Sequence, residues 1–312
     1  MQQAKLPVRL LFLIMAAATL TPWVSAPVAL LGGFVFAQVF RCPYPDGSAR
    51  VSSLLLKIAI VGLGFGMNLQ SALKAGQDGF WLTLASICLI LVLGVLAGRL
   101  LKMPQRVSWL VASGTAICGG SAIAAVGPAV RASAEEMSVA LGVVFLLNAA
   151  ALLLFPILGH ALGLDQYHFG IWSAIAIHDT SSVVGAASAY GDEALQVATT
   201  VKLARALWII PLTLLSLFLF RDKQGKRKLY LPLFIAGFIA AMLANTWLPL
   251  PAWFSGGVTA AAKSSLALCL FLIGSALNIG TLRAVGWQPL ALGLTLWVVC
   301  SLFSLGAILY LV

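Results

Sequence analysis

The stretch AIHDTSSVVG, residues 176–185, places a histidine, an acid and three hydroxyl residues inside an apolar part of the chain. His178 could bind a substrate or carry a coupling proton, because imidazole titrates near neutral pH. It could also be a hydrogen-bonded structural group or a metal ligand. Asp179 is a candidate for ion coupling, and the hydroxyls of Thr180 and Ser181 could bind a substrate or satisfy free backbone groups.

A second stretch, AICGGSAIAAVGP at residues 116–128, resembles the first. Glycine weakens a helix by about 1 kcal/mol relative to alanine, so both stretches predict discontinuous helices at membrane depth. The N-terminal ends of such half-helices attract anions. Close packing of small residues is the alternative explanation, and the likeness reflects either shared composition or a re-entrant hairpin. The candidate substrate-binding residues here are Cys118, Gly119, Gly120 and Ser121.

Five charged residues fall within apolar segments, where each costs roughly 2.5–3.5 kcal/mol unless it is paired, faces a cavity or reaches the membrane surface. They are Lys57, Asp179, Lys202, Arg205 and Lys263. Lys57 and Lys263 lie near segment ends and are expected to reach the surface. Lys202 and Arg205 are spaced i, i+3 and share a helix face. This pair is expected to bind a substrate anion.

These residues are carried by apolar helices. The 312 residues are 61% hydrophobic and 9% charged, whereas soluble domains average about 25% charged residues. A helix needs about 20 apolar residues to cross a bilayer. The sequence predicts an all-α polytopic membrane protein, a single transporter domain over residues 1–312, with about eleven transmembrane segments. These are 7–22, 26–40, 50–70, 78–101, 106–130, 134–162, 167–190, 193–220, 229–248, 258–280 and 288–311.

The distribution of cations predicts the orientation of these segments. Cytoplasmic loops carry an excess of Lys and Arg, and the eleven segments divide the cations very unevenly. An N-terminus in the cytoplasm and a C-terminus on the periplasmic side place thirteen cations inside and only Lys74 and Arg131 outside. The thirteen are Lys5, Arg9, Arg41, Arg50, Arg99, Lys102, Arg106, Arg221, Lys223, Lys226, Arg227, Lys228 and Arg283. The N-terminal apolar run is expected to be a first helix rather than a cleaved signal.

An internal repeat relates two parts of the chain. IVGLGFGMNLQSALKAG at 60–76 matches LFLIGSALNIGTLRAVG at 270–286, with Asn68 aligned to Asn278. The two segments cross in opposite directions, and inverted repeats are typical of transporters. Residues 50–101 and 258–311 should therefore superpose about an axis in the membrane plane, with both asparagines lining or bracing the substrate site. The glycines favour close helix packing rather than a dinucleotide loop.

Other function classes fit the sequence less well. The cysteines have neither metal-ligand nor disulfide spacing, so no metal and no cofactor are expected. The net charge of +10 reflects topology in a membrane protein, so no nucleic-acid partner is expected. An anion channel is the main alternative to a transporter. An intramembrane serine protease that uses Ser121 and His178 is a more distant alternative. The protein is expected not to be an enzyme.

The blocks ICGGSAIAA (117–125), AIHDTSSVV (176–184), VKLARALWIIP (201–211) and GFGMNL (64–69) together resemble a family of bacterial inner-membrane proteins provisionally named sulfate exporters. That family is distantly similar to the bile-acid and sodium/proton antiporter-type transporters. The resemblance implies a scaffold and a core with discontinuous helices, and sulfate, sulfite or an organosulfonate as substrate. The chain departs from the family at Asp179, where relatives often carry Glu.

The sequence thus favours a secondary transporter of small anions, an exporter in the bacterial inner membrane that works by alternating access. Its expected partners are the anionic substrate, a coupling proton or sodium ion and the lipid bilayer. A homodimer is among its expected assemblies.

Overall fold

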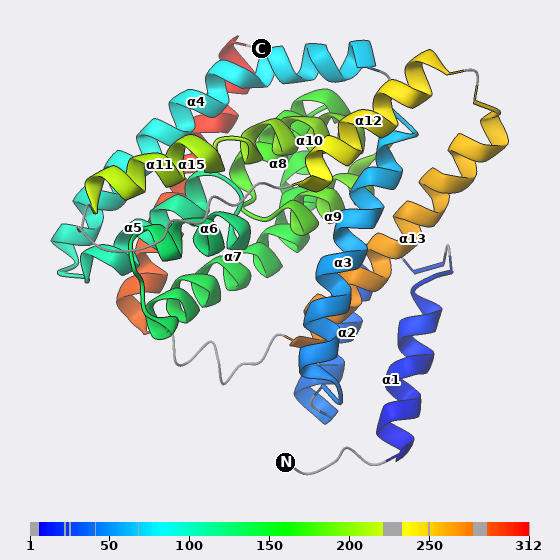
Figure 1. Ribbon diagram of the computed structural model, residues 1–312, viewed down its shortest axis with the longest axis horizontal. Coiled ribbons are helices and arrows are strands. Elements are labelled where there is room, and N and C mark those ends of the chain that lie inside the picture. The colour runs from blue at the N-terminus through cyan, green and yellow to red at the C-terminus, as the bar shows by residue number, and fades with distance from the viewer. Residues whose placement is uncertain are drawn as a thin grey trace. The chain divides into compact units, whose positions relative to one another are not determined.

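A computed structural model describes residues 6–21, 23–24, 26–40, 42–67, 69–220, 233–248, 250–276 and 286–311. Across these residues all regular structure is helical (Figure 1). The helices are α1 (Leu6–Ala18), α2 (Ala26–Phe40), α3 (Pro45–Gly64), α4 (Leu69–Leu100), α5 (Gln105–Ala116), α6 (Gly120–Ala129), α7 (Ala134–Ala161), α8 (Gln166–Ala176), α9 (Thr180–Tyr190), α10 (Asp192–Ala206), α11 (Ile209–Leu219), α12 (Leu233–Trp247), α13 (Ala252–Ala276) and α15 (Trp287–Leu311).

The prediction of an all-helical membrane protein is confirmed. Among the described residues, five helical stretches are long and apolar enough to cross a bilayer, and shorter apolar helices accompany them. The five stretches are Gly76–Leu100, Glu135–Ala161, Asp192–Leu219, Ala252–Ala276 and Trp287–Tyr310. The full set of eleven segments stays a prediction.

The chain separates into two compact units. The single transporter domain over residues 1–312 stays a prediction. The first unit comprises Met1–Ala72 and Leu233–Gly280, and the second comprises Leu73–Pro232 and Thr281–Val312. The predicted repeat halves, 50–101 and 258–311, are each divided between these units. Their symmetry therefore stays a prediction.

The first unit is built around α13, which packs along both α2 and α3 (Figure 1). Glycines allow this close approach. A β-carbon on Gly33 of α2 would collide with the carbonyl oxygen of Phe271, and one on Gly274 of α13 would collide with that of Leu30. A β-carbon on Gly64 of α3 would lie 2.7 Å from the carbonyl oxygen of Phe238. These contacts agree with the interpretation of the repeat glycines as packing residues.

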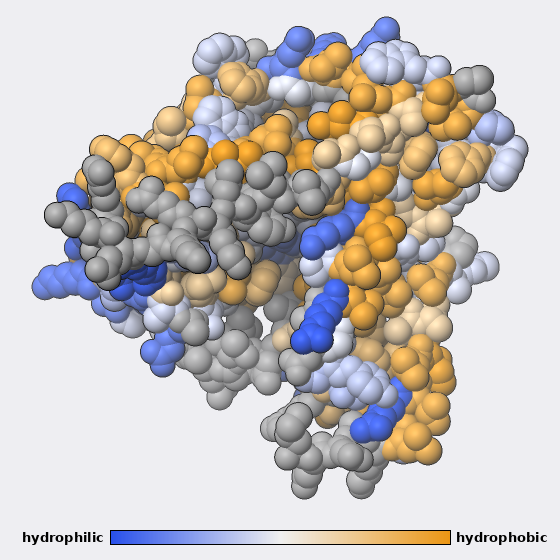
Figure 2. Space-filling view, in the orientation of Figure 1, coloured by the Kyte–Doolittle hydropathy of each residue, from blue (hydrophilic) through white to orange (hydrophobic). Residues whose placement is uncertain are grey.

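Helix α1 presents a hydrophobic outer surface in the first unit. Leu6, Leu10, Leu13 and Ile14 are between 52% and 71% exposed, and Figure 2 shows hydrophobic side chains over α1 and α13. Its opposite side contributes Phe12 to a buried aromatic cluster. An exposed apolar surface of this kind suits contact with lipid rather than water.

The second unit holds both candidate stretches on short, buried helices. Every residue from Val107 to Ala116 of α5 and from Phe169 to Ala176 of α8 is buried. Helix α10 packs against α8 and α9, while α7 packs against α5 and α9. Most candidate residues of these two stretches lie in the interior of this unit, whereas Ser121 is exposed.

The predicted segment 193–220 agrees with the apolar stretch Asp192–Leu219, within which the helix is interrupted at residues 207–208. Helix α10 ends at Ala206 and α11 begins at Ile209. Pro211 lacks the N–H that would bond the carbonyl of Leu207 and its ring would clash there, which accounts for the interruption. Pro156 lies within the continuous α7, so a proline alone does not predict a break.

Candidate functional site

The first candidate stretch is a break between α5 and α6. Residues 117–119 are not helical, as the glycine and serine content predicts. Gly119 has φ 63° and ψ −124°, a left-handed conformation that glycine adopts without strain. Its N–H donates to the carbonyl of Gly114 at 2.9 Å, which closes the end of α5. Cys118 is buried within the break, and Ser121 in the first turn of α6 is exposed.

The second candidate stretch is a break between α8 and α9. Residues 177–179 are not helical, so the discontinuity is confirmed here as well. Asp179 caps α9, because its carboxylate accepts hydrogen bonds from the backbone N–H and the hydroxyl of Ser181. The N–H of Asp179 donates to Oδ1 of Asn148 on α7 at 3.1 Å. Asp179 is therefore fixed at both its backbone and its carboxylate.

The two breaks lie against each other. A β-carbon on Gly119 would lie 3.4 Å from both Cα and Cβ of Asp179, and 3.0 Å from a methyl group of Val144 on α7. The N-terminal ends of α6 and α9 thus begin beside the same point. The sequence-predicted residues of both stretches, Cys118 to Ser121 and His178 to Ser181, form one cluster.

Lys202 binds the carbonyl ends of both preceding half-helices. Its Nζ donates to the carbonyl oxygens of Ile117 at 3.1 Å, Ala174 at 3.2 Å and Ile177 at 2.7 Å. The side chain is fully buried. A cation is favoured at helix C-termini, where unpaired carbonyls carry partial negative charge. Each of the three ammonium protons of Lys202 thus has a carbonyl partner.

Arg205, one turn further along α10, reinforces the same arrangement. Its Nε donates to the carbonyl of Ala116 at 2.9 Å, and Nη1 donates to the hydroxyl of Ser86 on α4 at 3.0 Å. Nη2 is buried and has no oxygen or nitrogen partner. The thiol of Cys300 on α15 also interacts with the guanidinium. The expectation that Lys202 and Arg205 share a face is met, but that face meets carbonyl oxygens. Their direct binding of a substrate anion stays a prediction.

His178 lies in the second break with both ring nitrogens buried and without a hydrogen-bond partner. Whichever nitrogen carries the proton, one ring nitrogen can donate and the other can accept. The described residues contain no group of three or more His, Cys, Asp or Glu side chains that could hold a metal ion.

Two predicted residues, Asn68 and Asn278, lie outside the described residues. Two others that contact the cluster were not predicted. Asn148 orients Asp179, and Ser86 accepts from Arg205. Asn148 has a sequence signal, because it is an isolated amide in the apolar run LGVVFLLNAAALLLF. Ser86 has none, since a serine in an apolar helix commonly bonds its own backbone, as Ser86 also does through the carbonyl of Thr83.

Comparisons with known proteins identify relatives along almost the whole chain. Residues 10–293 match the family described as conserved hypothetical protein 698. A UPF0324 membrane protein of Shewanella oneidensis is 50% identical over 308 residues, which cover 99% of this chain and 97% of the relative. One from Bacteroides thetaiotaomicron is 50% identical over 291 residues, covering 92% and 87% respectively. One from Porphyromonas gingivalis is 52% identical over 293 residues, covering 93% and 88%.

No solved structure matches the chain. The apolar helices and the membrane-protein relatives together identify a bacterial multi-pass membrane protein. The broken helices α5–α6 and α8–α9 are therefore part of a membrane protein. The chain belongs to the conserved hypothetical protein 698 family, the UPF0324 membrane proteins.

Proposed function

We propose that the protein is a secondary active transporter of small anions that works by alternating access, with its anion site at the N-terminus of α6. The observation that carries this proposal is a difference between the two half-helices that begin at the breaks. Helix α9 has a resident anion, the Asp179 carboxylate, at its N-terminus. Helix α6 begins at Gly120 with no side-chain cap. An anionic solute fits the uncapped end, where N–H groups and the helix dipole favour negative charge.

Two side chains support this location. Ser121, in the first turn of α6, is exposed and can offer its hydroxyl to a solute. His178, in the neighbouring break, has two ring nitrogens without partners. Buried polar groups normally have hydrogen-bond partners, so the histidine calls for a ligand or ordered water beside it. A protonated His178 would strengthen anion binding, which couples anion and proton movement.

The charges around the breaks leave a positive excess. Lys202 and Arg205 supply two positive charges, and Asp179 supplies one negative charge. The two C-terminal and two N-terminal helix ends contribute roughly half a charge each and cancel. One net positive charge remains, which favours a single anion over a cation. The two cations act from behind the site, through the carbonyl ends that they neutralise.

Sulfate, sulfite and organosulfonates are the proposed substrates, on the strength of the family resemblance in the sequence blocks. The proposal includes export across the bacterial inner membrane, with the N-terminus in the cytoplasm. A proton or sodium ion acting at Asp179 and His178 would provide the coupling.

The test compares Ser121→Asp with Ser133→Asp in purified protein. Each variant adds one carboxylate at a helix N-terminus, because Ser133 is the exposed cap of α7. A carboxylate at residue 121 would occupy the proposed anion site and weaken sulfate binding by at least about a hundredfold, since juxtaposed like charges cost several kcal/mol. Ser133→Asp should bind like the unaltered protein. Binding is measured by thermal shift against sulfate, sulfite, taurine, sulfoacetate and dicarboxylates.

Flux in proteoliposomes separates a transporter from an anion channel. Unlabelled anion on the opposite side should accelerate uptake of the labelled anion that binds best, because a carrier returns faster when loaded. Flux that ignores the opposite side would indicate a channel. Equal anion binding by Ser121→Asp and Ser133→Asp would remove the proposed site from α6.

A further inference from the structure

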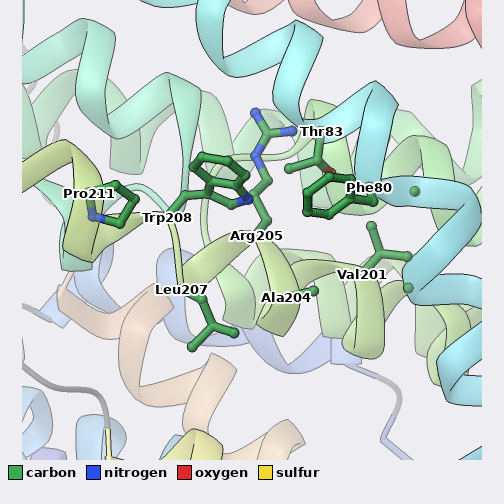
Figure 3. A pocket seen from close by; sticks show the side chains of 10 residues that line it. Phe80, Thr83, Val201, Ala204, Arg205, Leu207, Trp208 and Pro211 are labelled. Carbon is green, nitrogen blue, oxygen red and sulfur yellow. The ribbon is translucent and has the colours of Figure 1, made fainter.

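A cavity of about 320 Å³ lies in the second unit (Figure 3). None of its lining residues belongs to α6 or α9, the helices that begin at the two breaks. Helix α4 lines one side through Gly76, Gly79, Phe80 and Thr83. The end of α10 and the start of α11 line the other side, including the interruption at residues 207–208. Most of this lining is apolar. Its volume is at the lower end of the range for small-molecule pockets in proteins.

Two aromatic residues, Phe80 and Trp208, and one charged residue, Arg205, are among those that line this cavity. The ring centroids of Phe80 and Trp208 are 6.1 Å apart. In Figure 3 the Arg205 side chain projects from α10 between these two rings. The Phe80 side chain is 44% exposed, so its ring can turn without disturbing the core. An apolar wall with a single charged group is the pattern of a site for a molecule with one charged end.

Arg205 has one hydrogen-bonding edge without a strong acceptor. Nε and Nη1 are occupied by Ala116 and Ser86, whereas Nη2 is buried and has no oxygen or nitrogen partner. The thiol of Cys300 on α15, a weak acceptor, also interacts with the guanidinium. A buried donor that lacks a strong acceptor destabilises the unliganded site. An oxyanion bound in the cavity would accept from Nη2 and remove that cost. The Phe80 ring, which lies beside the Arg205 side chain in Figure 3, would turn aside to admit it.

We propose that this cavity binds an amphipathic organic anion, a carboxylate or sulfonate whose charged end meets Nη2 of Arg205 and whose apolar part lies against Phe80, Trp208 and Leu207. The cavity holds one aromatic ring or a short alkyl chain. Such an anion can come from water, as an aromatic sulfonate, or from the bilayer, as a fatty acid. This site is separate from the α6 site, and the proposal stands whether or not the protein transports inorganic anions.

The test uses bromine, which quenches the fluorescence of a tryptophan in contact with it. The probes are 4-bromobenzenesulfonate as the water-soluble anion, a dibrominated stearate as the bilayer anion, and 4-bromobenzenesulfonamide as the neutral control. Each is titrated into purified protein and into Trp208→Phe, so that the difference reports Trp208 alone. Saturable quenching by at least one anion is expected. The sulfonamide should bind about ten- to a hundredfold more weakly than the sulfonate, as for loss of a charge-assisted hydrogen bond.

Ala204→Phe provides a variant that leaves Arg205 intact. Ala204 is exposed and lines the cavity, so a phenyl group there fills it and should abolish saturable quenching. Trp81→Phe is the matched control for Trp208→Phe, because Trp81 is 73% exposed on α4 and lies outside the cavity.

Saturation by the sulfonate, by the stearate or by both supports the proposal and identifies the source. Absence of saturable quenching, undiminished quenching in Ala204→Phe, or equal affinity for the neutral probe would overturn it.

Discussion

At the scale of single residues, Lys202 and Arg205 satisfy two requirements with the same hydrogen bonds: partners for charges in apolar segments and partners for the carbonyls at buried helix ends. A charged group in an apolar segment needs a partner, and a helix that ends inside a protein leaves carbonyl oxygens that also need one. The structure satisfies both needs with the same contacts, from Lys202 to Ile117, Ala174 and Ile177. The two cations hold the helix ends at both breaks in place.

The first prediction concerns Lys202→Met. The thioether keeps the apolar stem but leaves three buried carbonyl oxygens without their donor. We expect a loss of stability of about 2–4 kcal/mol, because each unsatisfied buried group costs about 1–3 kcal/mol and the three can partly relax. Thermal unfolding in detergent measures the loss. Lys57→Met is the control, since Lys57 is half-buried on α3 and should change stability by no more than about 0.5 kcal/mol. Equal unfolding temperatures for the two variants would contradict the assigned role.

The residue types of the site were predictable, and their partners were not. The glycine, serine and histidine residues in AICGGSA and AIHDTSS predict both breaks, because these residue types have low helix propensity. The i, i+3 spacing of Lys202 and Arg205 gives their common face. Nothing in that spacing says whether the face meets a solute or the ends of α5 and α8. That choice depends on the crossing of helices some 85 residues apart in the chain.

At the scale of elements, the short helix α8 is held at both ends by side chains. Lys202 binds its last carbonyls, and Asp165 caps its first turn. The Asp165 carboxylate accepts from the N–H of His168 at 2.8 Å and lies 2.7 Å from Nδ1 of the same residue. The backbone N–H of His168 is the main cause that lowers the pKa of Asp165 below its ordinary value.

The second prediction follows from this cap. A lowered carboxyl pKa stabilises the folded state above the unfolded pKa of about 3.9, and the stabilisation is lost as pH falls through the lower folded pKa. Asp165→Ala should cost about 1 kcal/mol at pH 7. Asp165→Asn should keep most of the cap and lose the pH dependence, because asparagine caps helices well but does not titrate. Unfolding temperatures between pH 3 and pH 7 measure both effects. A parallel pH profile for Asp165→Asn and the unaltered protein would refute this account.

The third prediction concerns the packing of α2 on α13. Gly33→Val should destabilise the protein by about 1–3 kcal/mol, because the new side chain collides with the backbone of α13. Gly32→Val is a matched control on the same helix. A β-carbon at residue 32 meets only the mobile end of Met15, at 3.7 Å. The comparison uses thermal unfolding of both variants, and equal losses would show that helix propensity rather than packing is responsible.

The element boundaries show where sequence reasoning ends. The predicted segment 26–40 coincides with α2, because its limits are set by hydrophobicity alone. The apolar segment predicted at 78–101 agrees with the stretch Gly76–Leu100. Helix α4 itself begins earlier, at Leu69, because it continues through polar residues before that stretch. Hydropathy cannot detect such an extension. The interruption at residues 207–208 depends on Pro211 and on the local packing of two helices, which a proline count does not resolve.

At the scale of the whole molecule, the uneven distribution of cations predicts an orientation. The fourth prediction uses a cysteine-free background with Lys102→Cys or Arg131→Cys, both at exposed positions. In intact cells a membrane-impermeant maleimide should label residue 131 from the periplasm and should reach residue 102 only after the inner membrane is opened. The reason is the positive-inside rule. Labelling of residue 102 in intact cells, with residue 131 protected, would reverse the topology.

The bonds of Lys202 also bear on how the protein is made. The carbonyl of Ile117 leaves the ribosome 85 residues before the lysine that binds it. At a synthesis rate of about 5–20 residues per second, this delay lasts roughly 4–17 s. During that interval the α5–α6 break lacks its cation, and α8 has yet to be completed for part of it. The crossing therefore cannot assume its final form until α10 has entered the membrane, so a nascent chain stalled before residue 202 would expose these carbonyls to the insertion machinery.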